Sequence, residues 1–439
     1  MRNLSIIVIT LGFAVAAAAC GGPAKGANAP TGNGGTVGKV NAEGKHAKQA
    51  PTRRVSKDAK KDFMEAVAAD KKAQVDGWTQ DECNDVAAKW DDVASEHPKL
   101  VEARYNAGLA YHQCGMLGKA ETEYKKALSI VGSHAPSISN IGEIRFARGD
   151  VNGAKAQWEL ALKADSKLVA ARNNLAWLLL DQLRTTKNRS TWKRIEKEAR
   201  DQLSSVLAVD QSNYKAYVLY GLVYLEGSER NKNRLDLSKL LLDEAKKHNP
   251  DYPPLQNAYG LLYLRRNSQG RALEKFSKAV ELDPDFLEAR MNVGNITLNF
   301  RKYDVAEQQF SYVLKKQPKN YDALIGLGIA ERGLGKIDEA EKNYVAAKRA
   351  DSRRPEAYYN LGVLYKDFRA NKASDLQGSI SMYEKAKQYF SQFLTKQGIA
   401  TDDKEEAKDN IHDCDKTVKQ IRDAIKAMQA ANQPDDAAK

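Results

Sequence analysis

Residues 253–286 read PPLQNAYGLLYLRRNSQGRALEKFSKAVELDPDF, and their pattern decides the fold. Gly260 comes first, Ala272 follows about twelve residues later, and Phe276 stands one helical turn beyond the alanine. An Asp-Pro pair at 283–284 closes the unit. Small residues let two helices approach closely, an aromatic ring fills the space beside them, and proline ends a helix. The stretch therefore predicts a hairpin of two packed helices.

The same positions recur along the chain with a period of about 34 residues. The glycines on this grid are Gly108, Gly142, Gly260, Gly294, Gly328 and Gly362. The alanines that follow are Ala120, Ala154, Ala272, Ala306 and Ala340, and the aromatic residues are Tyr124, Trp158, Phe276, Phe310 and Tyr344. A single hairpin cannot bury its apolar face, so a fixed period of this length predicts a stack of hairpins with a continuous core.

This pattern resembles the tetratricopeptide repeat over most of the chain. The resemblance implies an all-α fold, a right-handed superhelix (α-solenoid) of about nine helical hairpins in which the first helix of each hairpin lines a concave groove. We expect the array over residues 57–398, a capping helix at 399–432 and a disordered tail at 433–439. Units 169–213 and 214–252 exceed the period by about eleven and five residues, and both additions are polar and basic.

The predicted capping helix carries one apolar stripe with residues spaced three and four apart, which is typical of an amphipathic helix. Its members are Ile411, Cys414, Val418, Ile421, Ile425 and Met428. We expect this stripe to cover the apolar face of the last hairpin. The alternative is a short coiled-coil seam for a partner, although fewer than three heptads support it.

The first twenty residues, MRNLSIIVITLGFAVAAAAC, form a predicted targeting segment rather than part of the fold. Arg2 precedes an apolar run at 4–15 that is too short to span a bilayer. The small residues before Cys20 resemble the lipobox of bacterial lipoproteins, although Ala17 stands where leucine is most common in that family. The resemblance implies that signal peptide 1–20 ends at a lipidated cysteine. The alternative is an ordinary signal peptide cut within the alanine run.

A lipidated Cys20 would hold the chain stably at a membrane, because several acyl chains on one residue exceed what reversible binding needs. Residues 21–56 are rich in Gly, Ala, Asn and Lys and lack aromatic residues, so we expect a flexible tether. The absence of aspartate directly after the cysteine favours, by analogy with the family, the periplasmic face of the outer membrane. We therefore expect a lipid-anchored protein of the bacterial cell envelope.

Composition and motifs narrow the function classes. The 69 Lys and Arg outnumber the 57 Asp and Glu, giving a net charge of +12 that favours anionic partners. The basic residues are interspersed with acidic ones, however, as on most exposed helical faces, and no basic block points to nucleic acid. Phosphate-binding Gly-rich loops, GxSxG and HExxH are missing from the sequence, and the grid leaves no room for a catalytic domain. We predict a non-enzyme without cofactor or small-molecule substrate.

Two cysteines lie where stacked hairpins would bring them together. Cys83 is near the start of one second helix, and Cys114 is at the end of the next first helix, so both fall on the same edge of the array. An oxidising compartment then favours a Cys83–Cys114 disulfide. The alternatives are two reduced, buried cysteines or a metal site built from these cysteines with His112 and His134. The metal site lacks the usual ligand spacing, and we predict none.

A series of asparagines marks the predicted groove. Asn106, Asn140 and Asn174 recur at the repeat spacing, and Asn292 and Asn360 stand at the same phase later in the chain. Each amide can donate and accept, so a ladder of them could bind the main chain of an extended peptide. Neighbouring candidates for peptide binding are Tyr105, Trp177 and Tyr359. The alternative is that asparagine is simply the commonest residue at this position of the family's repeat.

Residues 82–115, ECNDVAAKWDDVASEHPKLVEARYNAGLAYHQCG, are similar to the gliding-motility lipoproteins of myxobacteria. That similarity implies a non-catalytic scaffold lipoprotein, anchored in the envelope, that binds partner proteins and assembles or stabilises a trans-envelope machine. Two other functions remain open. One is a lipoprotein for pilus, secretin or outer-membrane-protein assembly. The other is a module that binds peptidoglycan or lipopolysaccharide through its positive charge.

Overall fold

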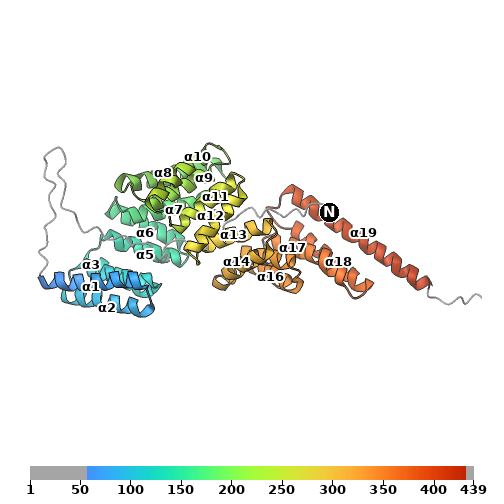
Figure 1. The fold of residues 1–439 in the computed structure, drawn as a ribbon, viewed down its shortest axis with the longest axis horizontal. Coiled ribbons are helices and arrows are strands. Elements are labelled where there is room, and N and C mark those ends of the chain that lie inside the picture. Colours follow the sequence, from blue (N-terminus) through green and yellow to red (C-terminus); the bar gives the residue numbers. More distant parts are fainter. Residues whose placement is uncertain (1–56, 432–439) are drawn as a thin grey trace, which may run out of the picture. The chain divides into compact units, whose positions relative to one another are not determined.

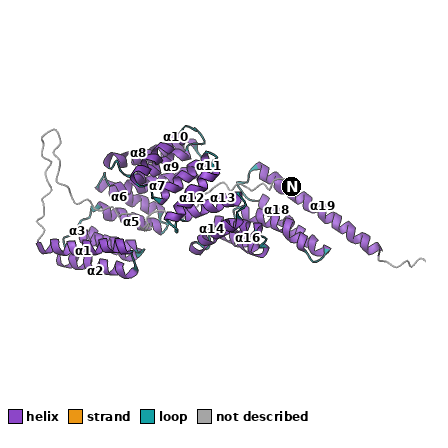
Figure 2. Cartoon of the chain, viewed as in Figure 1, coloured by secondary structure: helices purple, strands orange, loops and turns teal. Residues whose placement is uncertain are grey.

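The computed structural model describes residues 57–431, and this part of the chain is helical throughout, without a strand (Figures 1 and 2). The all-α prediction is confirmed. The predicted signal peptide with Cys20, the tether at 21–56 and the tail at 433–439 lie outside the described residues. Within the described range, no helix is both long enough and apolar enough to cross a membrane.

The described chain divides into two compact units. The first comprises residues 57–268 together with 281–283. Its helices are α1 (Lys57–Asp76), α2 (Gln80–Glu96), α3 (Val101–Gln113), α4 (Leu117–Ile130), α5 (Ala135–Ala147), α6 (Val151–Ala164), α7 (Val169–Thr185), α8 (Arg189–Val209), α9 (Tyr214–Glu226), α10 (Arg234–His248) and α11 (Pro253–Arg265).

The second unit comprises residues 269–280 and 284–431 of the described chain. Its helices are α12 (Gln269–Leu282, whose last residues count with the first unit), α13 (Leu287–Asn299), α14 (Tyr303–Lys316), α15 (Tyr321–Gly333), α16 (Ile337–Ala350), α17 (Glu356–Val363), α18 (Leu376–Leu394) and α19 (Thr401–Ala431). A π-helix, η1 (Leu364–Arg369), and a 3-10 turn, η2 (Ala370–Lys372), lie between α17 and α18.

Successive helices pack as hairpins inside each unit. In the first unit α3 packs on α4, α5 on α6, α7 on α8 and α9 on α10, and in the second α13 packs on α14, α15 on α16 and α17 on α18. The second helix of a hairpin also packs on the first helix of the next, as α2 does on α3, α4 on α5 and α14 on α15. This is the nearest-neighbour stacking expected of a helical-repeat solenoid.

The grid glycines lie where the two helices of a hairpin come closest. A Cβ atom on Gly108 would stand 2.5 Å from the Tyr124 ring, and one on Gly328 would stand 2.5 Å from the Tyr344 ring. The same contact joins Gly142 to Trp158, Gly294 to Phe310 and Gly362 to Phe390. The rings are fully buried. Glycine is needed because any side chain would occupy the volume of the ring, so the packing role predicted for these glycines is confirmed.

The stretched units take up their extra residues in different ways, and the last of them, with Gly362 against Phe390, keeps the glycine–aromatic contact. In the other two, α7 contains no glycine and Gly221 of α9 meets Leu242. In the α7–α8 hairpin the two helices are 17 and 21 residues long, whereas α3 and α4 have 13 and 14 residues. In the next hairpin the extra residues form the connection between α9 and α10. In the last hairpin η1 and η2 absorb the extra length, and a π-helix takes up one more residue per turn than an α-helix.

The last helix, α19, packs against α18 with only part of its apolar stripe. Cys414 and Val418 are buried, whereas Ile421 and Ile425 are half-buried and Met428 is 58% exposed. The expected capping role therefore holds for the N-terminal part of the stripe. The C-terminal end of the stripe is exposed, because α18 has 19 residues and α19 has 31.

Candidate functional site

The first helices of three successive hairpins in the first unit carry a connected set of polar and aromatic side chains. At its base lies the fully buried Tyr124 of α4. The Asn140 amide donates to the Tyr124 hydroxyl oxygen at 3.0 Å, and Nδ1 of His112 lies 3.2 Å from the same oxygen. Because that oxygen already accepts from Asn140, its own proton can bond to a neutral His112 ring nitrogen.

Burial shifts the pKa values of His112, Tyr124 and Tyr105. Removal from water lowers the pKa of His112, and the nearby Glu143 carboxylate opposes this effect. Burial also raises the pKa of the Tyr124 hydroxyl well above its usual value, and raises that of Tyr105 to about 12. All three groups are therefore neutral at pH 7, and they offer hydrogen bonds rather than charge.

Above this base, α5 and α7 are joined by polar and aromatic contacts. The Asn174 amide donates to Oε1 of Glu143 at 2.9 Å. One turn further along both helices, the Phe146 and Trp177 rings meet edge to face with centroids 5.0 Å apart. Phe146 is buried, but Trp177 is only half-buried and keeps part of its ring at the surface.

Tyr105 continues the set onto α3. Its ring meets His134 edge to face with centroids 5.2 Å apart, and lies 5.8 Å from the ring of Tyr124. Tyr105 and its neighbour Asn106 are half-buried. We call five half-buried residues on the first helices α3, α5 and α7 the first-helix cluster: Tyr105, Asn106, Glu143, Asn174 and Trp177. The cluster combines amide donors and acceptors, a carboxylate and aromatic rings that remain partly accessible.

The five asparagines of the predicted ladder do not share one environment. Asn106 and Asn174 are half-buried, whereas Asn140 is buried and bonded to Tyr124 as described above. In the second unit Asn292 is only 1% exposed, and Asn360 is buried with its amide donating to the Glu356 carbonyl at 2.9 Å. Three of the five amides are therefore buried, and peptide binding by the asparagine ladder stays a prediction.

Tyr359 also has an internal role in the structure. Its hydroxyl donates to Oε1 of Glu406 on α19 at 2.6 Å. Its ring packs on Phe390 and Phe393, with centroids 5.6 and 5.3 Å away. Tyr359 thus ties the last hairpin to the final helix. Sequence reasoning missed this, because α19 stands outside the repeat grid and its register against α17 cannot be read from the period.

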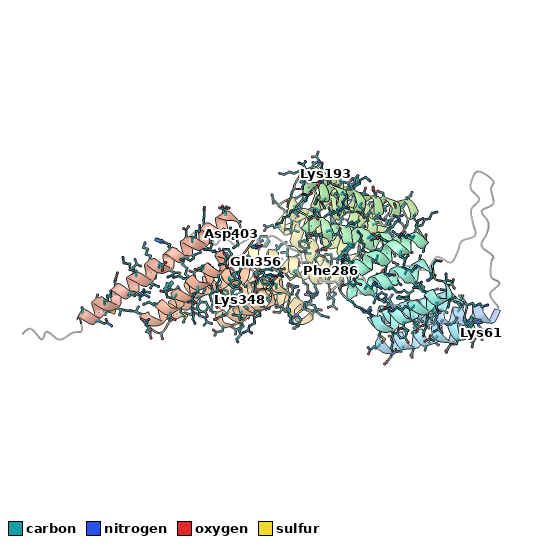
Figure 3. All side chains as sticks on the ribbon, turned by 180° about the vertical axis from the view of Figure 1, so that it is seen from behind. Lys61, Lys193, Phe286, Lys348, Glu356 and Asp403 are labelled. Carbon is teal, nitrogen blue, oxygen red and sulfur yellow. A yellow bond between two sulfur atoms is a disulfide. The ribbon has the colours of Figure 1, made fainter. Side chains whose placement is uncertain are left out.

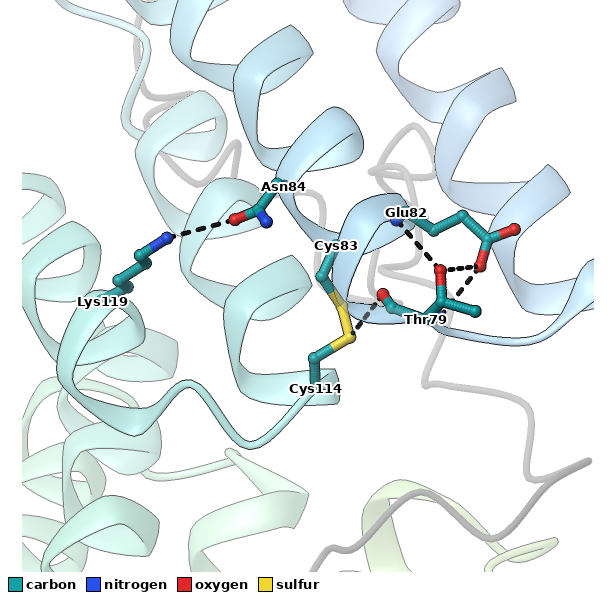
Figure 4. The surroundings of a disulfide bond; sticks show 6 residues. All are labelled: Thr79, Glu82, Cys83, Asn84, Cys114 and Lys119. Carbon is teal, nitrogen blue, oxygen red and sulfur yellow. Dashed lines mark hydrogen bonds between the residues drawn. A yellow bond between two sulfur atoms is a disulfide. The ribbon is translucent and has the colours of Figure 1, made fainter.

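The structure joins Cys83 and Cys114 as a disulfide (Figure 4). Their Cα atoms are 6.3 Å apart, a separation that a disulfide can span. Cys83 lies in the first turn of α2, behind a Thr79 cap whose hydroxyl accepts from the Glu82 amide, and Cys114 ends α3. Helix ends on one edge of the stack thus meet.

With the two sulfur atoms bonded to each other, Cys83 and Cys114 do not form the alternative metal site with His112 and His134. His112 instead faces Tyr124, and His134 lies within bonding distance of Ser137 at 2.8 Å. Among the described residues, one group brings three possible ligands together: Asp62, Glu96 and His97. There Nε2 of His97 lies 3.7 Å from Asp62 and 4.0 Å from the exposed Glu96, so the group brings α1 next to the end of α2.

Comparison with solved structures returns proteins that match about half of this chain. A thermophilic tetratricopeptide-repeat protein of Thermus thermophilus is 20% identical over 45% of this chain and 99% of its own, with a TM-score of 0.38. The type IV pilus biogenesis factor PilW is 16% identical over 54% of this chain and 97% of its own, with a TM-score of 0.41. The Pseudomonas aeruginosa protein PilF is 20% identical over 51% and 94%, with a TM-score of 0.39.

Among the curated proteins, none matches this chain. The tetratricopeptide repeat family, in contrast, matches it in two regions. One match covers residues 101–130, and two overlapping matches cover residues 294–352 and 325–368. The first region is the α3–α4 hairpin that carries Tyr105, and the second runs from α13 into η1. Residues 101–130 and 294–368 therefore match the tetratricopeptide repeat, and the matched hairpins α3–α4, α13–α14 and α15–α16 each show the glycine–aromatic contact.

Proposed function

We propose that this protein is a non-catalytic scaffold whose tetratricopeptide repeats bind partner proteins through the first-helix cluster. The observation that carries the proposal is the half-buried set of Tyr105, Asn106, Glu143, Asn174 and Trp177 on consecutive first helices. Its amides and carboxylate can pair with the main chain of an extended segment, while Trp177 offers the kind of aromatic anchor on which interface affinity depends. The buried bonds beneath the cluster hold it in place before a partner arrives, which lowers the entropic cost of binding.

A paired substitution tests the cluster. We expect Asn174→Ala combined with Trp177→Ala to remove partner proteins from a crosslinking pulldown made with the tagged full chain. The matched control is Leu160→Ala combined with Val209→Ala, because these apolar side chains are exposed on the second helices α6 and α8. An unchanged partner list for the cluster variant, or an equal loss for the control, would contradict this assignment.

We further propose that the scaffold is held at the periplasmic face of the outer membrane by lipid on Cys20. The support is the signal-like segment before that cysteine and the aromatic-free stretch after it. Fractionation of cells carrying Cys20→Ala tests the anchor, and we expect the variant to leave the membrane fraction. If the variant stays in the membrane with an unchanged partner list, the anchor is elsewhere.

The machine we propose for this scaffold is a trans-envelope gliding-motility complex. The support is the similarity of residues 82–115, including both bridged cysteines, to myxobacterial motility lipoproteins. Deletion of the gene should abolish cell movement while pili, secretins and outer-membrane barrels assemble normally. A block in pilus, secretin or barrel assembly would assign the protein to that process instead. Retention on purified peptidoglycan or lipopolysaccharide, lost at high salt, would identify a polymer-binding module.

A further inference from the structure

Two segments of the first unit exceed what the repeat needs, and the structure brings them together. One is residues 185–201, which contain the lengthened start of α8. The other is residues 226–236, which connect α9 to α10. We call the surface that they form the insertion surface. Trp192 and Ile195 of the first segment pack into the core of this unit, whereas most of the basic residues of both segments are exposed.

Specific contacts lock the two segments to each other. The Arg230 guanidinium lies over the Trp192 ring, 4.1 Å from its centroid, and Arg234 approaches the same ring at 5.7 Å. Arg234 also pairs with the buried Glu196 at 2.6 Å. Cation–π contacts and partly buried ion pairs of this kind keep the two segments in one arrangement, which isolated surface charges do not. Residues 38 positions apart in sequence therefore form one surface.

This surface has a surplus of positive charge. The two segments contain nine Lys or Arg and six Asp or Glu. All six carboxylates are already paired: Glu196 with Arg234, Glu198 with Arg194, Asp201 with Lys197, Glu226 with Arg184, Glu229 with Arg265, and Asp236 with Arg266. Three of the arginines in these pairs come from outside the segments, so the local surplus is larger than the segment composition alone suggests.

The surplus cations are exposed. Five of them have no carboxylate within ion-pair distance in the described part of the chain: Lys187, Arg189, Lys193, Arg230 and Lys232. Figure 3 shows Lys193 at the outer edge of its unit. Unpaired cations held at one place attract anions, and the planar guanidinium fork of arginine fits a carboxylate with two parallel hydrogen bonds.

We propose that the insertion surface binds an acidic segment of a partner protein. The surface shares no residue with the first-helix cluster, so the inference goes beyond the proposed function and gives the scaffold a second point of attachment. A partner that binds both surfaces of one chain is held more tightly than it would be by either surface alone. The surplus positive charge is complementary to a carboxylate-rich segment. A lipid surface fits less well, because the aromatic ring of Trp192 is 5% exposed and covered by Arg230.

The test measures binding of a fluorescein-labelled twenty-residue peptide of alternating Glu and Ser to the full chain by anisotropy. The variant reverses three exposed cations: Lys187→Glu, Arg189→Glu and Lys193→Glu. The control reverses three exposed lysines elsewhere in the first unit that have no ion-pair partner among residues 57–431: Lys89→Glu, Lys163→Glu and Lys167→Glu. Both variants change the net charge equally. We expect the first to weaken binding by about tenfold or more and the control by less than about threefold.

Several outcomes would overturn the inference. The first is absence of binding to the unmodified chain at low salt, and the second is an equal loss in both charge variants, which would reflect net charge alone. The third is binding to phosphatidylglycerol vesicles that depends on the three cations while the peptide does not bind, which would assign a lipid surface. Asn174→Ala with Trp177→Ala should leave peptide binding unchanged, so failure here is separable from failure of the first-helix cluster. Circular dichroism checks that every variant is folded.

Discussion

Gly108 shows how one residue without a side chain sets the distance between two helices. The Tyr124 ring occupies the space where its Cβ would be, at 2.5 Å. A methyl group there must push the ring, and the ring in turn holds the Asn140 and His112 bonds described above. Packing and the polar base of the first-helix cluster therefore depend on the same contact.

A pair of glycine-to-alanine substitutions in one hairpin tests this. Gly108→Ala should lower the free energy of unfolding by about 1–3 kcal/mol, because overpacking forces side chains from their preferred rotamers. Gly118→Ala is the control, because a Cβ there meets nothing within 4 Å, and alanine favours a helix over glycine by about 1 kcal/mol. Urea unfolding of the two variants measures the difference. Equal destabilisation by both would show that the close approach does not limit the packing.

His112 gives the hairpin a pH dependence whose sign follows from its burial. Its pKa in the folded chain is lowered by burial, so the unfolded chain binds a proton first as the pH falls. The stability that the neutral His112 ring contributes is fully present above about pH 6.5, the pKa of histidine in the unfolded chain. It is lost as the pH drops below that value. We expect the unmodified protein to lose more stability between pH 7 and pH 5 than His112→Gln, measured by urea unfolding. An identical loss in both would show that His112 does not titrate on unfolding.

At the scale of the element, the disulfide connects a helix start to a helix end in neighbouring hairpins. It closes a loop of 31 residues, for which chain-entropy arguments give about 2–4 kcal/mol. The third cysteine of the described chain, Cys414, is buried in α19, and burial raises the pKa of its thiol to about 11. A protonated, buried thiol is a poor nucleophile, so Cys414 should not compete for either partner.

Reduction of the purified protein should therefore lower the stability of the first hairpins by about 2–4 kcal/mol. The double variant Cys83→Ala with Cys114→Ala should show the lower stability without reductant and no further change when reductant is added. Non-reducing peptide mapping should recover a crosslinked peptide containing Cys83 and Cys114, with Cys414 free. Free thiols at both Cys83 and Cys114 would contradict the bridge.

The last hairpin shows how an element keeps its packing while its length changes. Gly362 and Phe390 are 28 residues apart, whereas Gly328 and Tyr344 are 16 apart, yet both pairs make the same close contact. The π-helix η1 and the turn η2 take up the difference. In this hairpin, helix length and connection therefore differ from those of its neighbour while the glycine still meets the ring.

At the scale of the whole molecule, stacked hairpins pack on their sequence neighbours, and the effect of a local change should stay local. Val418→Asp places a carboxylate at a position that is 3% exposed against α18, which is costly without a partner. We expect hydrogen exchange to accelerate in α17, α18 and α19 and to stay unchanged in α3 to α6. Met428→Asp, at an exposed position of the same stripe, is the control and should change neither region. Faster exchange in α3 to α6 would mean that the array opens as one cooperative body.

The hairpin order, the glycine–aromatic contacts and the edge on which Cys83 and Cys114 meet were predictable from the sequence. These features depend on residues that recur at a fixed period, and a period determines which side of a helix faces its neighbour. Because similar units stack in chain order, the spacing of residues in the sequence predicts which of them contact the next helix.

The environment of each groove residue could not be predicted in the same way. Asn140 and Asn174 occupy one phase of the repeat and both bond to the preceding hairpin, but Asn140 bonds to Tyr124 on its second helix and Asn174 bonds to Glu143 on its first helix. The period places both on one face, whereas burial depends on the side chains that neighbouring helices present there. The contact of Arg230 with Trp192 could not be predicted either. It joins two inserted segments that do not follow the repeat period, so their spacing in the sequence does not indicate that they meet.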